Sequence, residues 1–205
     1  MVNNADDVFD RAFAETIRLH DRVRQQDRGA VFRTAETIVA TLRRGGKVLV
    51  FGNGGSAADA QHFAAELVGR YLRERRALPA IALTVDTSVL TAVGNDLSFD
   101  QIFSRQIEAL GIRGDVAIGI STSGQSSNIV EALKLAREWG LTTVAVTGGN
   151  GGPVGAAADI HVNVPDPSTP RVQEVHRTLL HVVCELVERE FIADASRNAN
   201  SGLKA

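Results

Sequence analysis

The helical segment that follows a glycine-rich loop carries side chains suited to acid–base chemistry. His62 and Glu66 are four residues apart and so share one face of a helix, and Arg70 follows one turn further on. A base, a carboxylate and a cation in one row can exchange protons with a substrate and bind a negatively charged group. The ordinary alternative is a solvated helix face with a surface ion pair, and this stretch alone fits both interpretations.

A tight glycine loop precedes this helix. The apolar run Val48–Phe51 predicts a buried strand, and the loop Gly52–Gly55 joins it to a helix that opens at Ser56. At the carboxyl end of a parallel strand, such a loop faces the crevice where α/β sheets bind ligands, and its glycines let backbone N–H groups approach an anion or a sugar. We therefore expect this loop to contact a ligand.

A second junction between a strand and a helix is rich in hydroxyl groups. Ser121–Asn128 (STSGQSSN) follows the apolar run 115–120 and precedes the helical segment IVEALKLAREWG. Hydroxyl and amide donors at a helix start suit a phosphate dianion. The loop lacks lysine and the GxxxxGK[ST] pattern, so a phosphorylated metabolite fits better than a nucleoside triphosphate. The alternative is serine-rich turn chemistry, for which one capping residue would suffice.

Helices and strands alternate along the rest of the chain, which predicts an α/β fold. Two amphipathic helices are expected over residues 5–26 and 30–42, and a long helix from Val172 to about Ala195, followed by a flexible tail, 196–205. A shorter helix is expected over 100–110. With Val48–Phe51, further apolar runs complete a central parallel sheet of five strands; they span 79–84, 115–120, 141–147 and 159–164.

Four connecting features carry their own expectations. Asp86 is expected to cap the turn that follows the second strand. Gly94-Asn95-Asp96 places polar groups at what we expect to be the carboxyl side of a strand. Gly148–Pro153 is expected to be a flexible connection without a side chain fit for chemistry. His161 alternates with Asn163 in the last strand, and we expect it on the surface.

The composition is that of an ordinary globular protein. The chain has 205 residues, of which 44% are hydrophobic and 22% charged, and a net charge of -2 gives no reason to expect a nucleic-acid partner. The single cysteine, Cys184, lies in an apolar helical pattern and suggests a buried thiol. The N-terminus carries acids where a signal peptide would carry bases, and no apolar run is long enough to span a membrane, so we expect a cytoplasmic protein.

Five motifs together identify a resemblance. In this order and at these separations, they resemble the sugar isomerase (SIS) domain family and, within it, the phosphoheptose isomerases: GNGGSA, DAQHFAAEL, VGND, STSGQSSN and RVQEVHRTLLH. The resemblance spans about residues 5–190. It implies a single SIS domain over 1–195, a three-layer α-β-α sandwich in which a helical hairpin, 5–44, precedes an α/β core, 47–195.

The resemblance also implies an activity and its residues. Members of this kind convert sedoheptulose 7-phosphate to D-glycero-D-manno-heptose 7-phosphate through an enediolate, the first step toward ADP- or GDP-heptose precursors such as those of lipopolysaccharide. Glu66 and His181 match the acid–base pair. A zinc ion is implied among His62, Glu66, Gln173 and His181. The implied sugar phosphate ligands are Asn53, Gly54, Gly55, Asn95, Asp96, Ser121, Thr122, Ser123 and Ser126, to which we add Ser56, Glu66, Arg70 and Gln173.

Isomerisation chemistry is consistent with this set, because it needs a base, an acid and a group that stabilises the enediolate. The family further implies a homotetramer with active sites between subunits, which would explain the two leading amphipathic helices. Two alternatives stay open. One is a partner-binding SIS-domain protein of the replication-initiator-associating type, which lacks the counterparts of Glu66 and His181; the other is an isomerase of another sugar phosphate, such as arabinose 5-phosphate.

Overall fold

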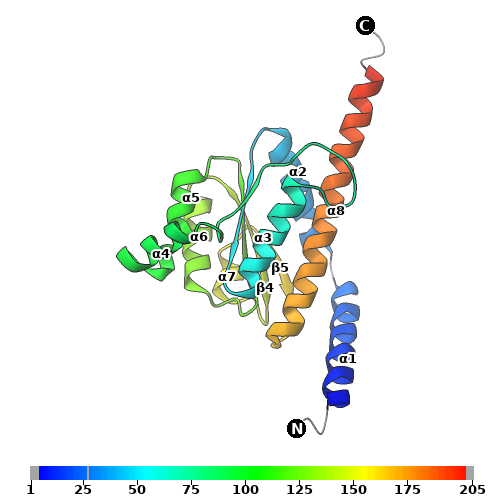
Figure 1. Ribbon diagram of the computed structural model, residues 1–205, viewed down its shortest axis with the longest axis vertical. Coiled ribbons are helices and arrows are strands. Elements are labelled where there is room, and N and C mark those ends of the chain that lie inside the picture. The colour runs from blue at the N-terminus through cyan, green and yellow to red at the C-terminus, as the bar shows by residue number, and fades with distance from the viewer. Residues whose placement is uncertain (1–4, 27, 202–205) are drawn as a thin grey trace.

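A five-stranded parallel sheet forms the centre of the molecule, as predicted. The computed structural model describes residues 5–26 and 28–201 (Figure 1). The strand order is β2-β1-β3-β4-β5, and the central pairing aligns Val50 with Ile118 and Ile118 with Val144. The five strands are β1 (Val48–Gly52), β2 (Ala80–Ala82), β3 (Val116–Ser121), β4 (Thr142–Gly148) and β5 (Ile160–Val164).

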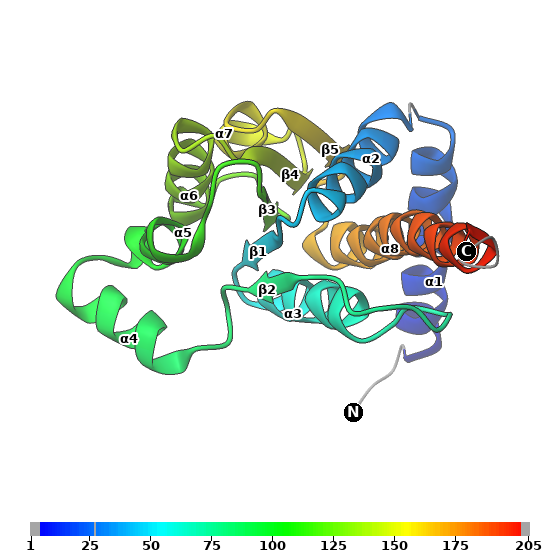
Figure 2. The same cartoon turned by 90° about the horizontal axis from the view of Figure 1, so that it is seen from above.

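Helices cover both faces of the sheet and complete three layers (Figure 2). Successive strand residues point to opposite faces, so Val48 and Val50 pack with one set of helices and Leu49 and Phe51 with the other. The first set is α2 (Gly29–Arg43), α3 (Gly55–Val68) and α8 (Thr169–Ser201); the second is α5 (Ser104–Leu110), α6 (Ser127–Glu138) and α7 (Gly152–Ala156).

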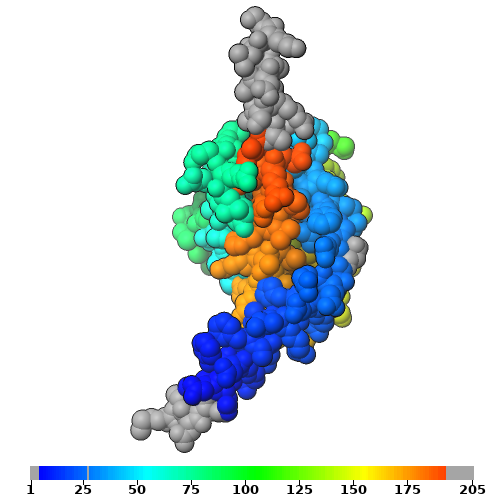
Figure 3. Space-filling view, turned by 90° about the vertical axis from the view of Figure 1, so that its right-hand side faces the viewer, coloured from blue at the N-terminus to red at the C-terminus, as the bar shows by residue number. Residues whose placement is uncertain are grey.

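The leading helix α1 (Ala5–Arg24) lies outside these layers, along the first half of α8 (Figure 1). Leu19 packs with Val172 and Val175, and the Arg22 guanidinium is 2.7 Å from the Asp166 carboxylate. In Figure 3, α1 extends beyond the body of the protein. Four large apolar side chains of α1 are more than half exposed: Val8, Phe9, Phe13 and Ile17.

The segment between β2 and α5 differs from the prediction. Asp86 caps a helix, as expected, by accepting from the Val89 N–H at 2.9 Å. That helix, α4 (Thr87–Asp96), contains Asn95 and Asp96, so they do not follow a strand. The helix expected over 100–110 is divided into a 3₁₀ turn, η1 (Phe99–Gln101), and α5. The Ser98 hydroxyl accepts from the Asp100 N–H at 3.0 Å and so favours the tighter turn.

Two other boundaries also differ from the prediction. The long helix begins at Thr169 rather than Val172, because Pro170 is compatible with a first helical turn, and it extends to Ser201. It therefore includes part of the segment expected to be a tail; residues 202–205 lie outside the described residues. Gly148–Pro153 is not wholly a connection, since Gly148 ends β4 and α7 begins at Gly152. The division into a domain and a tail stays a prediction.

None of the helices in the described part of the chain combines the length and apolarity needed to cross a bilayer. A cytoplasmic location stays a prediction from the sequence.

His161 is not on the surface as predicted but half-buried against α7. Its Nε2 is 2.6 Å from Thr147 Oγ1, and the ring packs on Gly151, where a Cβ would come within 2.8 Å of Nε2. His176 on α8 is fully buried beside β4, the strand that contains Thr147. Its Nε2 is 2.9 Å from the Thr147 carbonyl, and its Nδ1 is unpaired. Burial lowers the pKa of both imidazoles, so both favour the neutral form in the folded protein.

These two histidines predict an acid-sensitive stability. Their folded pKa values lie below the ordinary value of about 6.5, so the unfolded chain binds protons that the folded chain refuses as pH falls through that range. The free energy of unfolding is expected to decrease between pH 7.5 and 5.5, by at most about 1.4 kcal/mol per pH unit for each proton. Urea unfolding at fixed protein concentration measures this slope. His176→Gln is expected to reduce it; an unchanged slope would contradict the assignment.

Candidate active site

The acid–base candidates meet at the interface between α3 and α8. His62 and Glu66 share one face of α3, as their spacing predicts, and His62 Nε2 is 3.4 Å from Glu66 Oε1. His181 comes from α8, and its Nε2 is 2.8 Å from His62 Nε2. Burial and the nearby His62 lower the pKa of His181, while Glu66 opposes this shift. The His181 imidazole is therefore neutral and able to accept a proton near pH 7.

These three residues form a possible metal site. One ligand atom from each of His62, Glu66 and His181 lies within 4.8 Å of the others, and all three residues are partly exposed. Two imidazole nitrogens and a carboxylate suit zinc, with a position open to substrate. Two nitrogens bound to a tetrahedral zinc are about 3.3 Å apart, given Zn–N bonds of about 2.0 Å, so the imidazoles would separate slightly from 2.8 Å.

The predicted fourth ligand, Gln173, is directed elsewhere. Its amide Nε2 donates to Asp59 Oδ2 at 3.0 Å, and the amide packs on Gly55, where a Cβ would lie 2.7 Å from Gln173 Oε1. The glycine at 55 is thus required for a close approach between the loop and α8. Gln173 therefore lies at the glycine loop, and three of the four predicted metal ligands come together.

The glycine loop and the serine loop are tied to each other. Asn53 and Asn128 exchange two amide hydrogen bonds of 2.9 Å, one in each direction, which join the end of β1 to the first turn of α6. Gly54 and Gly55 are exposed beside this pair, and Ser56 is buried in the first turn of α3. Both predicted ligand loops thus lie at the carboxyl edge of neighbouring strands, as the α/β topology requires.

The serine loop leaves its helix start available for a ligand. Ser121 Oγ is 3.1 Å from Ser126 Oγ and 3.4 Å from Ser123 Oγ, and it accepts from the Gly124 N–H at 3.1 Å. Ser126 is the N-cap residue of α6, but its side chain makes no capping bond. Thr122 lies half-buried in the same loop. The arrangement argues against simple serine capping and favours the binding of an anion at the positive end of α6.

Arg70 does not join the His62–Glu66 row as predicted. The helix α3 ends at Val68, Gly69 is its C-cap, and Arg70 forms an exposed ion pair with Glu74. Asn95 and Asp96 hydrogen-bond to each other at the exposed end of α4. Their neighbour Gly94 lines a cleft of about 430 Å³ that also contacts Asn53 and Gly54. A role for the Arg70, Asn95 and Asp96 side chains in substrate binding stays a prediction.

The sequence reasoning missed two buried polar residues at the site. Asp59 is 1% exposed and accepts from Gln173 and from the Arg177 Nη2, the latter at 2.7 Å. Asn128 is 2% exposed and holds Asn53. An acid between Ala57-Ala58 and Ala60 in the first turns of α3 was a usable signal for Asp59, because a buried carboxylate needs a cation or amide partner. Cys184 is buried as predicted, and burial raises the pKa of its thiol.

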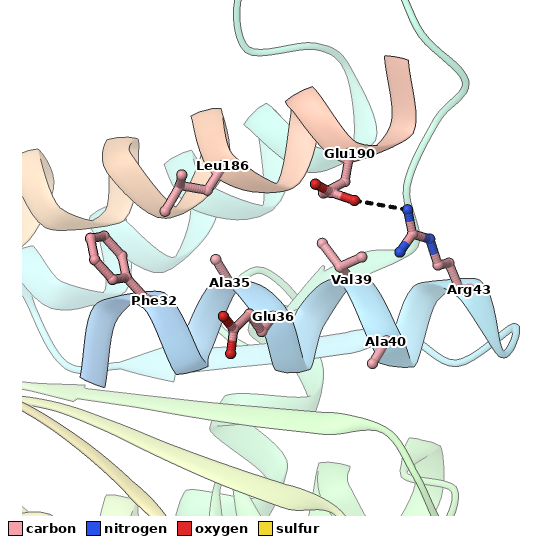
Figure 4. A pocket seen from close by; sticks show the side chains of 8 residues that line it. All are labelled: Phe32, Ala35, Glu36, Val39, Ala40, Arg43, Leu186 and Glu190. Carbon is pink, nitrogen blue, oxygen red and sulfur yellow. Dashed lines mark hydrogen bonds and ion pairs between the residues drawn. The ribbon is translucent and has the colours of Figure 1, made fainter. Parts of the chain in front are cut away.

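The hollow shown in Figure 4 lies away from this chemistry. It measures about 560 Å³ and is formed by α2 and α8, with Phe32, Ala35 and Val39 facing Leu186. An ion pair of 2.9 Å between Arg43 and Glu190 borders it. Since the hollow contains none of the acid–base or loop residues, it is not part of the candidate site.

Comparison with known proteins first defines the class. A family model described as SIS domain matches residues 13–148, which include the glycine loop, the helix with His62 and Glu66, and the serine loop.

More specific relatives then define the group within that class. The phosphoheptose isomerase of Geobacter sulfurreducens is 57% identical over 163 residues, which cover 80% of this chain and 86% of the relative. That of Syntrophotalea carbinolica is 50% identical over 185 residues, 90% of this chain and 94% of the relative. The solved structure of phosphoheptose isomerase from Neisseria gonorrhoeae has a TM-score of 0.85 at 45% identity, covering 90% of this chain and 98% of that one. The chain belongs to the phosphoheptose isomerase family of SIS-domain enzymes.

Proposed function

We propose that the protein converts sedoheptulose 7-phosphate to D-glycero-D-manno-heptose 7-phosphate by aldose–ketose isomerisation through an enediolate. The observation that carries this proposal is the meeting of Glu66 and His181 beside His62, in a chain whose relatives are phosphoheptose isomerases. A partner-binding SIS-domain protein would not need an acid–base pair. The relatives that are 50% and 57% identical are both phosphoheptose isomerases. They favour neither a partner-binding protein nor an isomerase of another sugar phosphate.

Glu66 and His181 supply the proton transfers. Isomerisation moves a proton from the carbon next to the carbonyl to the carbonyl carbon, while the carbonyl oxygen gains a proton and the hydroxyl oxygen on the first carbon loses one. The lowered pKa of His181 keeps its imidazole neutral near pH 7, and the Glu66 carboxylate is half-buried opposite it. One group can therefore accept a proton while the other, once protonated, donates one.

The phosphate and the sugar hydroxyls are held by the two loops. The hydroxyl groups of Ser121, Thr122, Ser123 and Ser126 and the first N–H groups of α6 suit the phosphate dianion. Asn53, Gly54, Gly55 and Ser56 contribute from the glycine loop, and Gln173 reaches the same loop from α8. The substrate would then extend from the serine loop toward Glu66 and His181.

One zinc ion per subunit is our proposal for the site formed by His62, Glu66 and His181, with Gln173 as a candidate fourth ligand after a change of rotamer. The donor set and its compactness support this assignment. When bound, such an ion supplies a Lewis acid that polarises the carbonyl oxygen or fixes the orientation of the residues around it.

A homotetramer with active sites between subunits is the proposed assembly. The exposed apolar side chains of α1 and the hollow between α2 and α8 support an interface there, because solvent-facing aromatic residues favour burial by a partner (Figures 3 and 4). Light scattering at micromolar concentration is expected to give four times the chain mass of 21.9 kDa. Phe9→Glu with Phe13→Glu is expected to reduce that mass, and a monomeric wild type would contradict the assembly.

The proposed reaction is tested by direct turnover. Wild-type protein is incubated with sedoheptulose 7-phosphate, with arabinose 5-phosphate or with buffer, and the products are followed by NMR with and without added zinc. We expect a heptose 7-phosphate to form from the first substrate only, and a chelator to lower the rate. Failure of a folded, zinc-loaded protein to convert sedoheptulose 7-phosphate would overturn the proposal.

A further inference from the structure

The segment that follows α3 crosses α8 and is held there by a buried ion pair. We call residues 69–78 the α3–β2 strap; in Figure 3 it lies beside α8. The Arg75 side chain is 1% exposed and the Glu188 side chain 3% exposed, with Arg75 Nε 3.5 Å from Glu188 Oε1. This is an ion-pair distance without a hydrogen bond, and it places two charges in the interior between the strap and α8.

The Glu188 carboxylate organises the start of the strap. It accepts from the backbone N–H groups of Tyr71 and Leu72 at 2.9 Å each and of Arg73 at 3.1 Å. These N–H groups have no helical partners because α3 has already ended. Three amide hydrogen bonds satisfy the buried carboxylate, the guanidinium balances its charge, and together they fix the strap on α8.

Arg75 connects the same carboxylate to the turn of α3 that bears Glu66. Its guanidinium donates to the carbonyl of Glu66 at 2.6 Å, of Leu67 at 2.9 Å and of Gly69 at 3.1 Å. The last carbonyls of a helix lack intrahelical partners and carry the negative end of the helix dipole, so a cation is favourable there. Arg75 therefore caps the end of α3 where the catalytic candidate Glu66 is located.

The two ends of this connection carry the two halves of the acid–base pair. Glu66 belongs to the turn that Arg75 caps, and His181 lies two turns before Glu188 on α8. The strap also packs the Tyr71 ring against His181, with 5.4 Å between ring centroids. We propose that Glu188 and Arg75 are positioning residues that set the alignment of Glu66 with His181 for the isomerisation; this inference rests on the proposed function.

A purely structural role makes a different prediction, and the chain offers a matched control. Asp115 is also a buried carboxylate: it accepts from the N–H groups of Lys47 and Ile112 and lies 2.6 Å from Lys47 Nζ. It precedes β3 at the amino end of that strand, and its partners lie in the segments before β1 and β3 rather than in α3, α8 or the strap. Asp115→Asn therefore reports what the loss of a buried ion pair costs the fold alone.

The test compares Glu188→Gln, Arg75→Lys and Asp115→Asn with the wild type. We expect all three to lower Tm. Only the first two are expected to lower kcat, by about ten- to a hundredfold, since small displacements of reacting groups have effects of this size. KM is expected to stay within about twofold, because the loops that hold the phosphate are outside the strap. A wild-type kcat in folded Glu188→Gln and Arg75→Lys would overturn the proposal.

A structural readout separates this inference from the proposed reaction. Crystal structures of the wild type and of Glu188→Gln report the separation of Glu66 from His181 whether or not the protein turns over the tested sugar. We expect that separation to change while the Asn53–Asn128 pair stays in place. Unchanged positions of Glu66, Tyr71 and His181 would overturn the positioning role, even if turnover is confirmed. Should Glu188→Gln fail to fold, Arg75→Lys, which keeps the positive charge, replaces it.

Discussion

Glu66→Gln is expected to lower kcat for sedoheptulose 7-phosphate by about a thousandfold, within the range that a single acid–base group contributes. Glutamine keeps the size of the side chain but cannot carry the proton. The fold is expected to tolerate the change, because Glu66 is partly exposed and its carboxylate faces His62 rather than the core. His181→Ala is expected to have an effect of similar size. The double variant should be little worse than either single one, since the two groups act as a unit.

The control for this experiment is Glu74→Gln. Glu74 is a carboxylate on the neighbouring strap, its side chain is 86% exposed, and it forms an ion pair with the exposed Arg70. We expect wild-type kcat from it. Zinc content is measured for each variant, because Glu66 is also a proposed ligand and glutamine retains an oxygen donor. If Glu66→Gln keeps its zinc but loses turnover, the loss is due to proton transfer. A kcat of Glu66→Gln above about a tenth of the wild-type value would contradict the assignment.

The sheet could be predicted from the sequence because its three central strands, β1, β3 and β4, are buried on both faces. Runs such as Val48–Phe51 and Val144–Val146 contain almost only apolar residues, which is the pattern of a parallel sheet covered by helices. Helix α4 gave no such signal. It has ten residues, none of them buried, and its apolar face is short, with Leu90 and Val93 packed partly against the core, while its polar end VGND suggested a loop.

The site was predictable where it depends on local spacing. The distance between His62 and Glu66 follows from one turn of helix, and the two ligand loops follow from the ends of strands. Arg70 was misplaced because a residue more than a hundred positions away decides where the chain leaves α3: Glu188 captures the backbone beyond Gly69. Asp59 and Asn128 were missed for the same reason, since their partners Arg177 and Asn53 are distant in sequence.

Gly124→Ala is expected to disrupt the serine loop and raise KM for the sugar phosphate at least tenfold. Gly124 has φ +68°, a conformation that costs a residue with a side chain about 1–3 kcal/mol. An added Cβ would also lie 2.6 Å from the backbone carbon of Gly151, which belongs to the tight turn before α7 and has little freedom to move. The glycine further joins the two segments through its carbonyl, which accepts from the Val154 N–H at 3.1 Å.

Gly114→Ala separates backbone strain from the steric effect. Gly114 has φ +92° but no atom within 4 Å of an added Cβ, and it lies before the amino end of β3, whereas the serine loop follows the carboxyl end of the same strand. We therefore expect both variants to lower Tm and only Gly124→Ala to weaken phosphate binding. KM for sedoheptulose 7-phosphate and Kd for inorganic phosphate measure this difference on folded protein. Both variants carry the backbone strain, but only Gly124→Ala overlaps with Gly151. A wild-type Kd for phosphate in Gly124→Ala would therefore mean that the serine loop does not hold the phosphate.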